Sequence, residues 1–154
     1  MKKNKNKTVV AVSGGFDPIH AGHVRMFQRA KELGDYLVVI LNNDNWLREK
    51  KHHIFMNDRE RKEIIGGLRA VDAVMLTGHK PHPKDMSVSK ELAKLHPDIF
   101  ANGGDRKPSG DPVPEVTLCK KLGIKMVYNV GDGGKVQSSS WLLAKYVKKV
   151  TKSK

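Results

Sequence analysis

Two histidines three residues apart follow a short apolar segment near the start of the chain. That segment, residues 8–12 (TVVAV), runs into a glycine-rich turn and then reaches His20 and His23. In a helix that begins at this point, residues three apart lie on one face, so both imidazoles can reach one bound group. Gly14 and Gly15 let the backbone approach a ligand closely because they have no Cβ. The start of a helix also favours an anion such as phosphate.

Paired imidazoles beside a phosphate site suit attack on the α-phosphate of a nucleoside triphosphate. Negative charge then builds up on the non-bridging and leaving oxygens, and donors held in place stabilise the transition state more than the ground state. His20 and His23 could instead bind a metal or have a purely structural role. A metal site would need a third ligand, and no nearby residue stands out as one. We therefore predict that both histidines are catalytic.

A known family carries the same loop. Residues 14–23, GGFDPIHAGH, resemble the GxFDxxHxGH signature of the cytidylyltransferase-like nucleotidyltransferases. Residues 29–41, RAKELGDYLVVIL, are similar to the helix and strand that follow it in bacterial glycerol-3-phosphate cytidylyltransferases. The likeness extends over nearly the whole chain. It implies transfer of CMP from CTP to a phosphorylated alcohol or sugar, with release of pyrophosphate and with Mg²⁺ on the triphosphate.

The resemblance also implies roles for single residues. His20 and His23 would contact the α-phosphate, while Phe16 and Asp17 would shape the loop that receives the triphosphate. Lys50 stands at the position of a lysine that neutralises phosphate charge after the second strand.

We expect Lys50 to lie in a loop over residues 45–53, where Lys51 could replace it if the loop shifted register. Arg61 also matches a family position and is predicted to bind the nucleotide. Judged from residue type alone, all three cations could equally be solvated surface charges.

The choice between CTP and ATP depends on later segments. Arg69 and Asp72 belong to a segment that resembles the RxVDxV segment of cytidylyltransferases, in which the arginine is implicated in catalysis. Otherwise Arg69 is an ordinary cation at a helix end. Against CTP, the Gly-Gly-Asp turn that ends at Asp105 resembles heptose-phosphate adenylyltransferases more closely. An adenylyltransferase using ATP on a sugar phosphate or a phosphorylated cofactor precursor is therefore the alternative.

The last motif departs from the family pattern. Cytidylyltransferases usually have RTxGxST before the final helix, whereas this chain has no arginine there and offers Lys135 as a point charge. Ser138 and Ser139 would keep a phosphate cradle of hydroxyls and backbone N–H groups, or would serve only as helix caps.

Apolar segments alternate with amphipathic ones along the chain. Near-continuous apolarity is typical of strands covered on both faces of a parallel sheet. We predict a single doubly wound (Rossmann-like) α/β domain with five parallel strands, which would bind ligands beyond the carboxyl ends of the strands. The predicted strands are 8–12, 36–41, 73–77, 98–101 and 125–129. The predicted helices are 21–33, 57–69, 87–95, 114–122 and 138–150.

Charge and composition narrow the class of protein. The formal net charge is +13, but residues 1–7 and 145–154 hold nine lysines and no acid, which leaves the rest of the chain only mildly basic. We predict a domain over residues 8–150 between basic tails at 1–7 and 151–154. A nucleic-acid-binding module is a distant alternative, because aromatic residues make up only 6% of the chain and no stacking platform is evident.

Other features set further expectations. No apolar run approaches the ~20 residues needed to span a bilayer, so we expect no membrane insertion and a cytoplasmic protein. The single Cys119 is expected to be a buried thiol. Segments 42–56 and 78–86 should select the acceptor, and the histidines they contain are expected to be solvated rather than metal ligands. The resemblance also implies a homodimer.

Overall fold

The computed structural model describes residues 6–103, 114–131 and 138–152. Within these residues the chain forms five strands and six helices. The strands are β1 (Val9–Gly14), β2 (Tyr36–Leu41), β3 (Ala73–Leu76), β4 (Ile99–Gly103) and β5 (Lys125–Val130). The helices are α1 (Ala21–Lys31), α2 (Asp44–Lys51), α3 (Asp58–Gly66), α4 (Ser89–Leu95), α5 (Val116–Leu122) and α6 (Ser139–Lys152).

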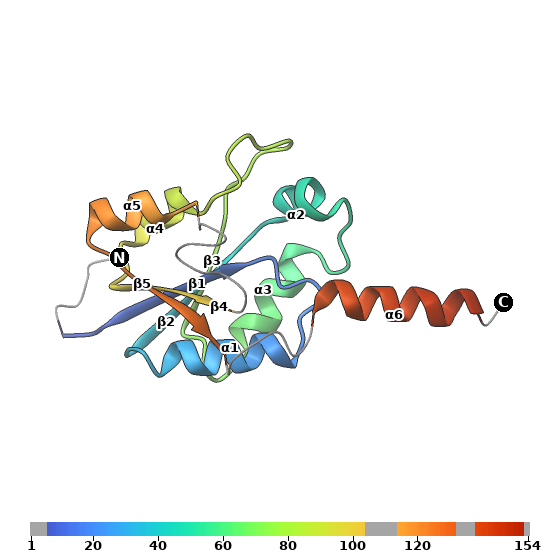
Figure 1. Ribbon diagram of the computed structural model, residues 1–154, viewed down its shortest axis with the longest axis horizontal. Coiled ribbons are helices and arrows are strands. Elements are labelled where there is room, and N and C mark those ends of the chain that lie inside the picture. Colours follow the sequence, from blue (N-terminus) through green and yellow to red (C-terminus); the bar gives the residue numbers. More distant parts are fainter. Residues whose placement is uncertain (1–5, 104–113, 132–137, 153–154) are drawn as a thin grey trace.

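The five strands form one parallel sheet in the order β3-β2-β1-β4-β5 (Figure 1). This confirms the predicted doubly wound α/β fold. The chain builds outward from β1 through β2 to β3, and then returns to the other side of β1 to place β4. The order therefore reverses between β1 and β4, and ligands of open α/β sheets bind at the carboxyl ends of the strands that flank such a point.

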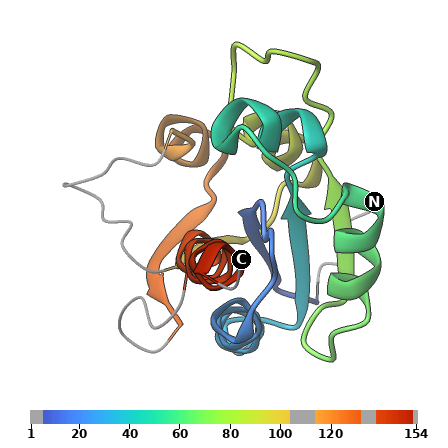
Figure 2. The ribbon, with the colours of Figure 1, turned by 90° about the vertical axis from the view of Figure 1, so that its right-hand side faces the viewer.

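Helices cover both faces of the sheet, with α4 and α5 on one face and α1 and α3 on the other (Figures 1 and 2). Each face has its own apolar core, and β1 contributes to both by alternation. Val10 and Val12 pack with Phe27 of α1, whereas Ala11 packs with Leu92 of α4 on the opposite face. The predicted buried thiol of Cys119 lies in the second core, where burial raises its pKa to about 11.

Helix α2 lies where the sequence led us to expect a loop. Asn43 caps it, because its side-chain oxygen accepts a hydrogen bond from the amide of Trp46 at 3.1 Å. Leu47 is buried on the inner side of this short helix. Local capping and one buried apolar contact are thus enough to make residues 44–51 helical, despite their high charge.

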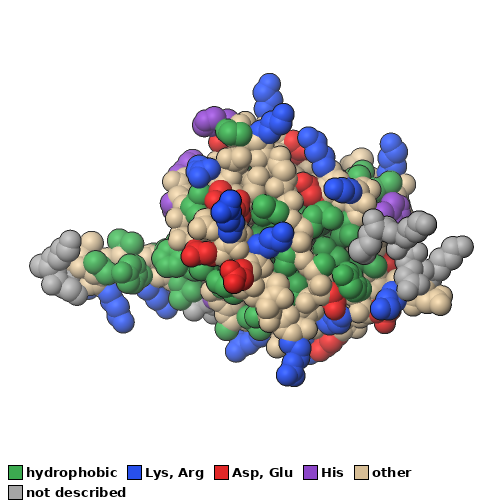
Figure 3. Space-filling model, turned by 180° about the vertical axis from the view of Figure 1, so that it is seen from behind, with side chains coloured by type: hydrophobic (Ala, Val, Ile, Leu, Met, Phe, Trp, Pro, Cys, Tyr) green, Lys and Arg blue, Asp and Glu red, His purple; other side chains and the backbone are tan. Residues whose placement is uncertain are grey.

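Helix α6 projects from the domain and has no buried residue (Figures 1 and 3). Hydrophobic side chains and lysines occupy different sides of the projecting helix in Figure 3. Among its exposed apolar side chains are Trp141, Tyr146 and Val147. No helix within the described ranges is long and apolar enough to cross a bilayer.

Gly34, between α1 and β2, lies so close to β1 that a side chain would not fit. A Cβ at this position would lie 2.7 Å from the Thr8 carbonyl oxygen and 2.7 Å from Val10 Cγ2. We expect Gly34→Ala to lower the free energy of unfolding by roughly 1–3 kcal/mol, as overpacking typically does. Gly78→Ala is the matched control, because a Cβ there meets nothing within 4 Å. Equal denaturation midpoints for the two variants would contradict this account of the α1–β2 connection.

Candidate active site

The two histidines are fixed by the first turn of α1. His20 is the N-cap residue, and its Nδ1 accepts a hydrogen bond from the Gly22 amide at 3.1 Å. His23 reaches back, and its Nδ1 accepts a hydrogen bond from the His20 amide at 3.3 Å. The pair forms a reciprocal capping box, in which imidazoles take the place of the usual hydroxyl and carboxylate.

These bonds determine which nitrogen of each ring is free. Because both Nδ1 atoms of His20 and His23 accept hydrogen bonds, the neutral rings carry their protons on Nε2. The rings stack with centroids 3.7 Å apart. Burial lowers the pKa of His20, and burial together with the neighbouring His20 lowers the pKa of His23 to about 3. At neutral pH the pair therefore presents two neutral N–H donors.

Phe16 supports His23 from beneath. Its ring is buried and meets the ring of His23 edge-on at 4.9 Å, and that of Phe27 at 5.0 Å. The Phe16 backbone has φ of 50°, in the left-handed region that bulky residues seldom adopt. Gly14 must lack a side chain here, because a Cβ would lie 2.8 Å from the Phe16 ring. Gly14, two residues before Phe16, therefore allows close packing beneath the histidine.

Asp17 anchors the same loop. Its carboxylate is 7% exposed and accepts hydrogen bonds from the amides of Phe55 and Met56, both at 2.7 Å. Asp17 thus ties the β1–α1 loop to the segment before α3. Asp17 also lines the cavity, and its role in receiving the triphosphate stays a prediction.

Arg61 is fully buried and does not line the cavity. Its guanidinium donates to the carbonyl oxygens of Gly15 and Asn42, each at 2.7 Å, and to that of Met56 at 2.9 Å. It also pairs with Asp44 at 2.8 Å. These contacts use its donors within the protein, so the structure corrects the prediction that Arg61 contacts the nucleotide. Arg61 instead positions the β1–α1 loop, which lines the cavity.

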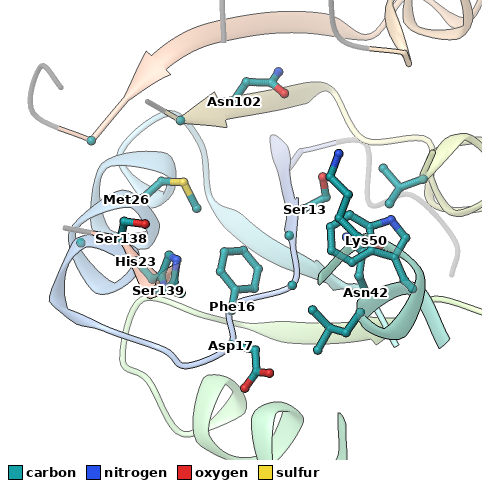
Figure 4. A pocket seen from close by; sticks show the side chains of 18 of the residues that line it. Ser13, Phe16, Asp17, His23, Met26, Asn42, Lys50, Asn102, Ser138 and Ser139 are labelled. Atoms are coloured by element: carbon teal, nitrogen blue, oxygen red, sulfur yellow. The ribbon is translucent and has the colours of Figure 1, made fainter. Parts of the chain in front are cut away.

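A cavity of about 540 Å³ opens above the histidines, at the carboxyl ends of β1, β2, β4 and β5 (Figure 4). Cavities of this size are typical of small-molecule sites. Several predicted residues come together in its wall: Gly14, Gly15, Phe16, Asp17, His20, His23, Lys50, Ser138 and Ser139.

The cationic and hydroxyl groups approach the cavity from opposite sides. Lys50 and Lys51 both line it from the last turn of α2, so no shift of register is needed to bring either one there. Ser138 and Ser139 lie at the start of α6, across Phe16 from Lys50 (Figure 4). The Ser139 hydroxyl donates to the Pro18 carbonyl oxygen at 2.8 Å, which fastens α6 to the histidine loop.

Two predicted residues are not brought to the cavity. Asp72 lies at the amino ends of the strands, where its carboxylate accepts a hydrogen bond from the Leu37 amide and pairs with Lys31. This placement corrects its predicted role at the nucleotide. Arg69 is exposed just before β3 and is not part of the cavity wall. Asp105 and Lys135 lie outside the described residues.

The cavity also contains residues that sequence reasoning missed. Asn42 and Trp46 line it beyond β2, and Met26 and Asn102 line it near β4. A signal existed for Asn42, because it directly follows the predicted strand 36–41, at the edge where ligands bind. Met26 and Trp46 gave no such signal, because their positions depend on how α1 and α2 pack.

His79, expected to be solvated, instead braces its segment. Its Nδ1 lies 2.8 Å from Thr77 Oγ1 and its Nε2 lies 3.1 Å from the Ser87 carbonyl oxygen. Across the described part of the chain, no three His, Cys, Asp or Glu side chains are grouped so that they could hold a metal ion.

Taken together, the site defines a class of phosphate-handling α/β proteins: neutral imidazole donors at a helix start, lysines opposite, and serines at a second helix start. Residues 11–123 match the family described as Cytidylyltransferase-like. The chain belongs to this family and is a nucleotidyltransferase.

Similar proteins agree with this assignment. The chain is 35% identical over 117 residues to a protein named FAD synthase from Aciduliprofundum boonei, covering 76% of this chain and 73% of that protein. It is 36% identical to Bifunctional protein HldE of Pelobacter propionicus, covering 71% of this chain but only 22% of HldE. Among solved structures, a lipopolysaccharide core biosynthesis protein from Thermoplasma volcanium superposes with a TM-score of 0.64 at 29% identity, over 81% of this chain and 98% of that one.

The buried guanidinium yields a prediction about stability and turnover. Arg61→Lys cannot reproduce the four contacts with a single ammonium group. We expect a loss of about 3–5 kcal/mol in the free energy of unfolding, as for other broken buried ion pairs, measured by urea denaturation. Because the Gly15 loop loses its anchor, turnover of the remaining folded protein should fall too. Arg59→Lys, at an exposed position of the same helix, should change neither; equal behaviour of the two variants would contradict the positioning role.

The histidine pair yields a prediction about protonation. In ¹⁵N NMR of the free protein, both rings should carry Nε2–H at pH 7, and His23 should stay neutral until the pH approaches about 3. Since the unfolded chain binds these protons near pH 6.5, the free energy of unfolding should fall as the pH drops from about 6.5 towards 3. His23→Asn should identify the signal and reduce that slope. Protonation of His23 near pH 6.5 would contradict the assignment.

Proposed function

We propose that the protein transfers AMP from ATP to a phosphorylated small molecule and releases pyrophosphate. The observation that carries this proposal is the similarity to a protein named FAD synthase over about three quarters of both chains. FAD is flavin mononucleotide joined to AMP, so a protein named FAD synthase fits AMP transfer to a phosphate. The similarity to HldE is a second support, because the Gly-Gly-Asp segment of this chain already resembles heptose-phosphate adenylyltransferases. This reverses the preference for CTP that the resemblance alone suggested.

The position of Arg69 also weakens the case for CTP. Arg69 was the residue that favoured a cytidylyltransferase, and it is exposed and outside the cavity wall. The wall near β4 is formed instead by Asn102 and Gly103, which begin the Gly-Gly-Asp segment that resembles adenylyltransferases.

The site supports an in-line displacement. An oxygen of the acceptor phosphate attacks the α-phosphorus, a new P–O bond forms, and the bond from the α-phosphorus to the bridging oxygen breaks as pyrophosphate leaves. A phosphate monoester is already nucleophilic at neutral pH, so no general base is needed. The Nε2–H groups of His20 and His23 would donate to the oxygens on which charge develops, and they need no proton uptake to do so.

Positive groups would complete the phosphate site. Lys50 and Lys51 would neutralise charge from the α2 side, and the α6 start with Ser138 and Ser139 would receive the distal phosphates. Mg²⁺ would enter with the triphosphate, which is how this ion commonly binds in phosphoryl-transfer sites. Asp17 is not suited to hold it, since both of its oxygens already accept backbone hydrogen bonds. The homodimer implied by the resemblance stays a prediction.

Pyrophosphate release tests the proposal. With Mg²⁺ and a panel that includes flavin mononucleotide, mannose 1-phosphate and glycerol 3-phosphate, we expect ATP to exceed CTP by at least tenfold in kcat/KM. His20→Ala and His23→Ala should each lose on the order of 10²–10³ in kcat, as for other transition-state donors. Arg59→Lys should match the wild type. A clear preference for CTP would show that the protein is a cytidylyltransferase. Near-normal turnover by either histidine variant would exclude the proposed mechanism.

A further inference from the structure

Asn42, a residue of the cavity wall, has a buried side-chain oxygen that makes no hydrogen bond to the described residues. Asn42 is 4% exposed and lines the cavity, and its side-chain oxygen Oδ1 accepts no hydrogen bond from the described part of the chain. Buried polar atoms are nearly always paired, so each exception requires an explanation. Because Asn42 lines the cavity, a hydrogen-bond donor on a bound ligand would explain the unpaired oxygen.

The Asn42 backbone explains why its side chain is available. The amide donates to the Gly14 carbonyl oxygen at 2.9 Å, and the carbonyl accepts from Arg61 at 2.7 Å. Its neighbour Asn43 is different, because its Oδ1 caps α2 and its Nδ2 donates to the His79 carbonyl oxygen at 2.8 Å. Of two adjacent asparagines, one has a side chain used by the fold and the other has a side-chain oxygen with no structural partner.

The surroundings of Asn42 indicate what kind of molecule would bind there. Figure 4 places Asn42 and Lys50 on one side of Phe16, with His23 and Ser139 on the other. Helix α2, which carries Lys50, also contributes Trp46, Leu47 and Lys51 to the cavity wall, and the Trp46 indole donates a hydrogen bond to the carbonyl oxygen of Met86, another wall residue. This part of the cavity wall therefore combines positive charge for a phosphate, apolar side chains, and one unpaired hydrogen-bond acceptor.

We infer that Asn42 determines acceptor specificity: its Oδ1 accepts a hydrogen bond from a hydroxyl or ring N–H of a phosphorylated acceptor whose phosphate lies near Lys50 and Lys51. The inference rests on the proposed function, which supplies this second substrate. A sugar phosphate offers hydroxyls, and flavin mononucleotide offers both hydroxyls and a ring N–H. The shared chemistry is a hydrogen-bond donor on a phosphorylated body, and the two sources are separated by experiment.

The test is Asn42→Leu, which removes the acceptor atom at similar volume. Calorimetric titration of mannose 1-phosphate and of flavin mononucleotide should show that at least one binds the wild type. That ligand should bind Asn42→Leu roughly 3- to 10-fold more weakly, the range for one neutral hydrogen bond. ATP should bind both proteins equally. The melting temperature should stay the same or rise, because no internal bond is lost, whereas Asn43→Leu should lower it by removing the α2 cap.

Each other outcome overturns the inference. Equal affinity of the tighter-binding phosphate for both proteins would show that Oδ1 contacts no acceptor. Failure of both phosphates to bind the wild type would overturn the inference as well. Weaker binding of ATP alone would place Asn42 in the nucleotide site. A fall in melting temperature for Asn42→Leu comparable with that of Asn43→Leu would make it a structural residue. Failure of the proposed function appears separately, as the absence of product with any triphosphate.

Discussion

A single buried guanidinium holds together several of the segments that form the cavity. Arg61 joins the loop after β1, the end of β2, the first turn of α2 and the segment before α3. A charge without water is tolerated only when its donors are paired, so these four segments have little freedom relative to one another. The cavity depends on this arrangement, because its glycine loop and its α2 side are two of the segments that Arg61 connects.

The histidine pair shows how one set of bonds can serve both fold and chemistry. A helix start needs acceptors for its free N–H groups, and the Nδ1 atoms of His20 and His23 supply them. The same bonds leave the opposite nitrogen of each ring as a donor facing the cavity. Burial keeps both rings neutral. A neutral ring remains useful as a donor, because its N–H can stabilise a developing oxyanion without any change of protonation.

The sequence predicted the sheet and the histidine loop well because both follow from local pattern. Apolar runs identify strands 36–41 and 125–129 closely, and the position of His20 at a helix start follows from its neighbours. Prediction from the sequence failed where a residue's position depends on packing between distant segments. Arg61 resembled a solvated or ligand-binding cation, and only the approach of the Gly15 and Asn42 carbonyls makes it internal. Asp72 matched a motif, but a lysine on α1 and an amide of β2 engage its carboxylate at the far edge of the sheet.

The histidine loop by itself does not determine which base or which acceptor the cavity binds. In the proposed reaction the loop would place the α-phosphate where the Nε2–H groups of both histidines can reach it. In the proposed in-line displacement the leaving pyrophosphate lies opposite the attacking oxygen, so an acceptor on the β2 and α2 side would direct the pyrophosphate towards the start of α6. The base is joined through the ribose to a different oxygen of the α-phosphate, so this geometry does not fix its direction. The loop selects neither the base nor the acceptor, because both choices depend on side chains from other elements. The same loop is therefore compatible with different bases and acceptors, and specificity must be sought in the walls, at residues such as Asn102 and Asn42.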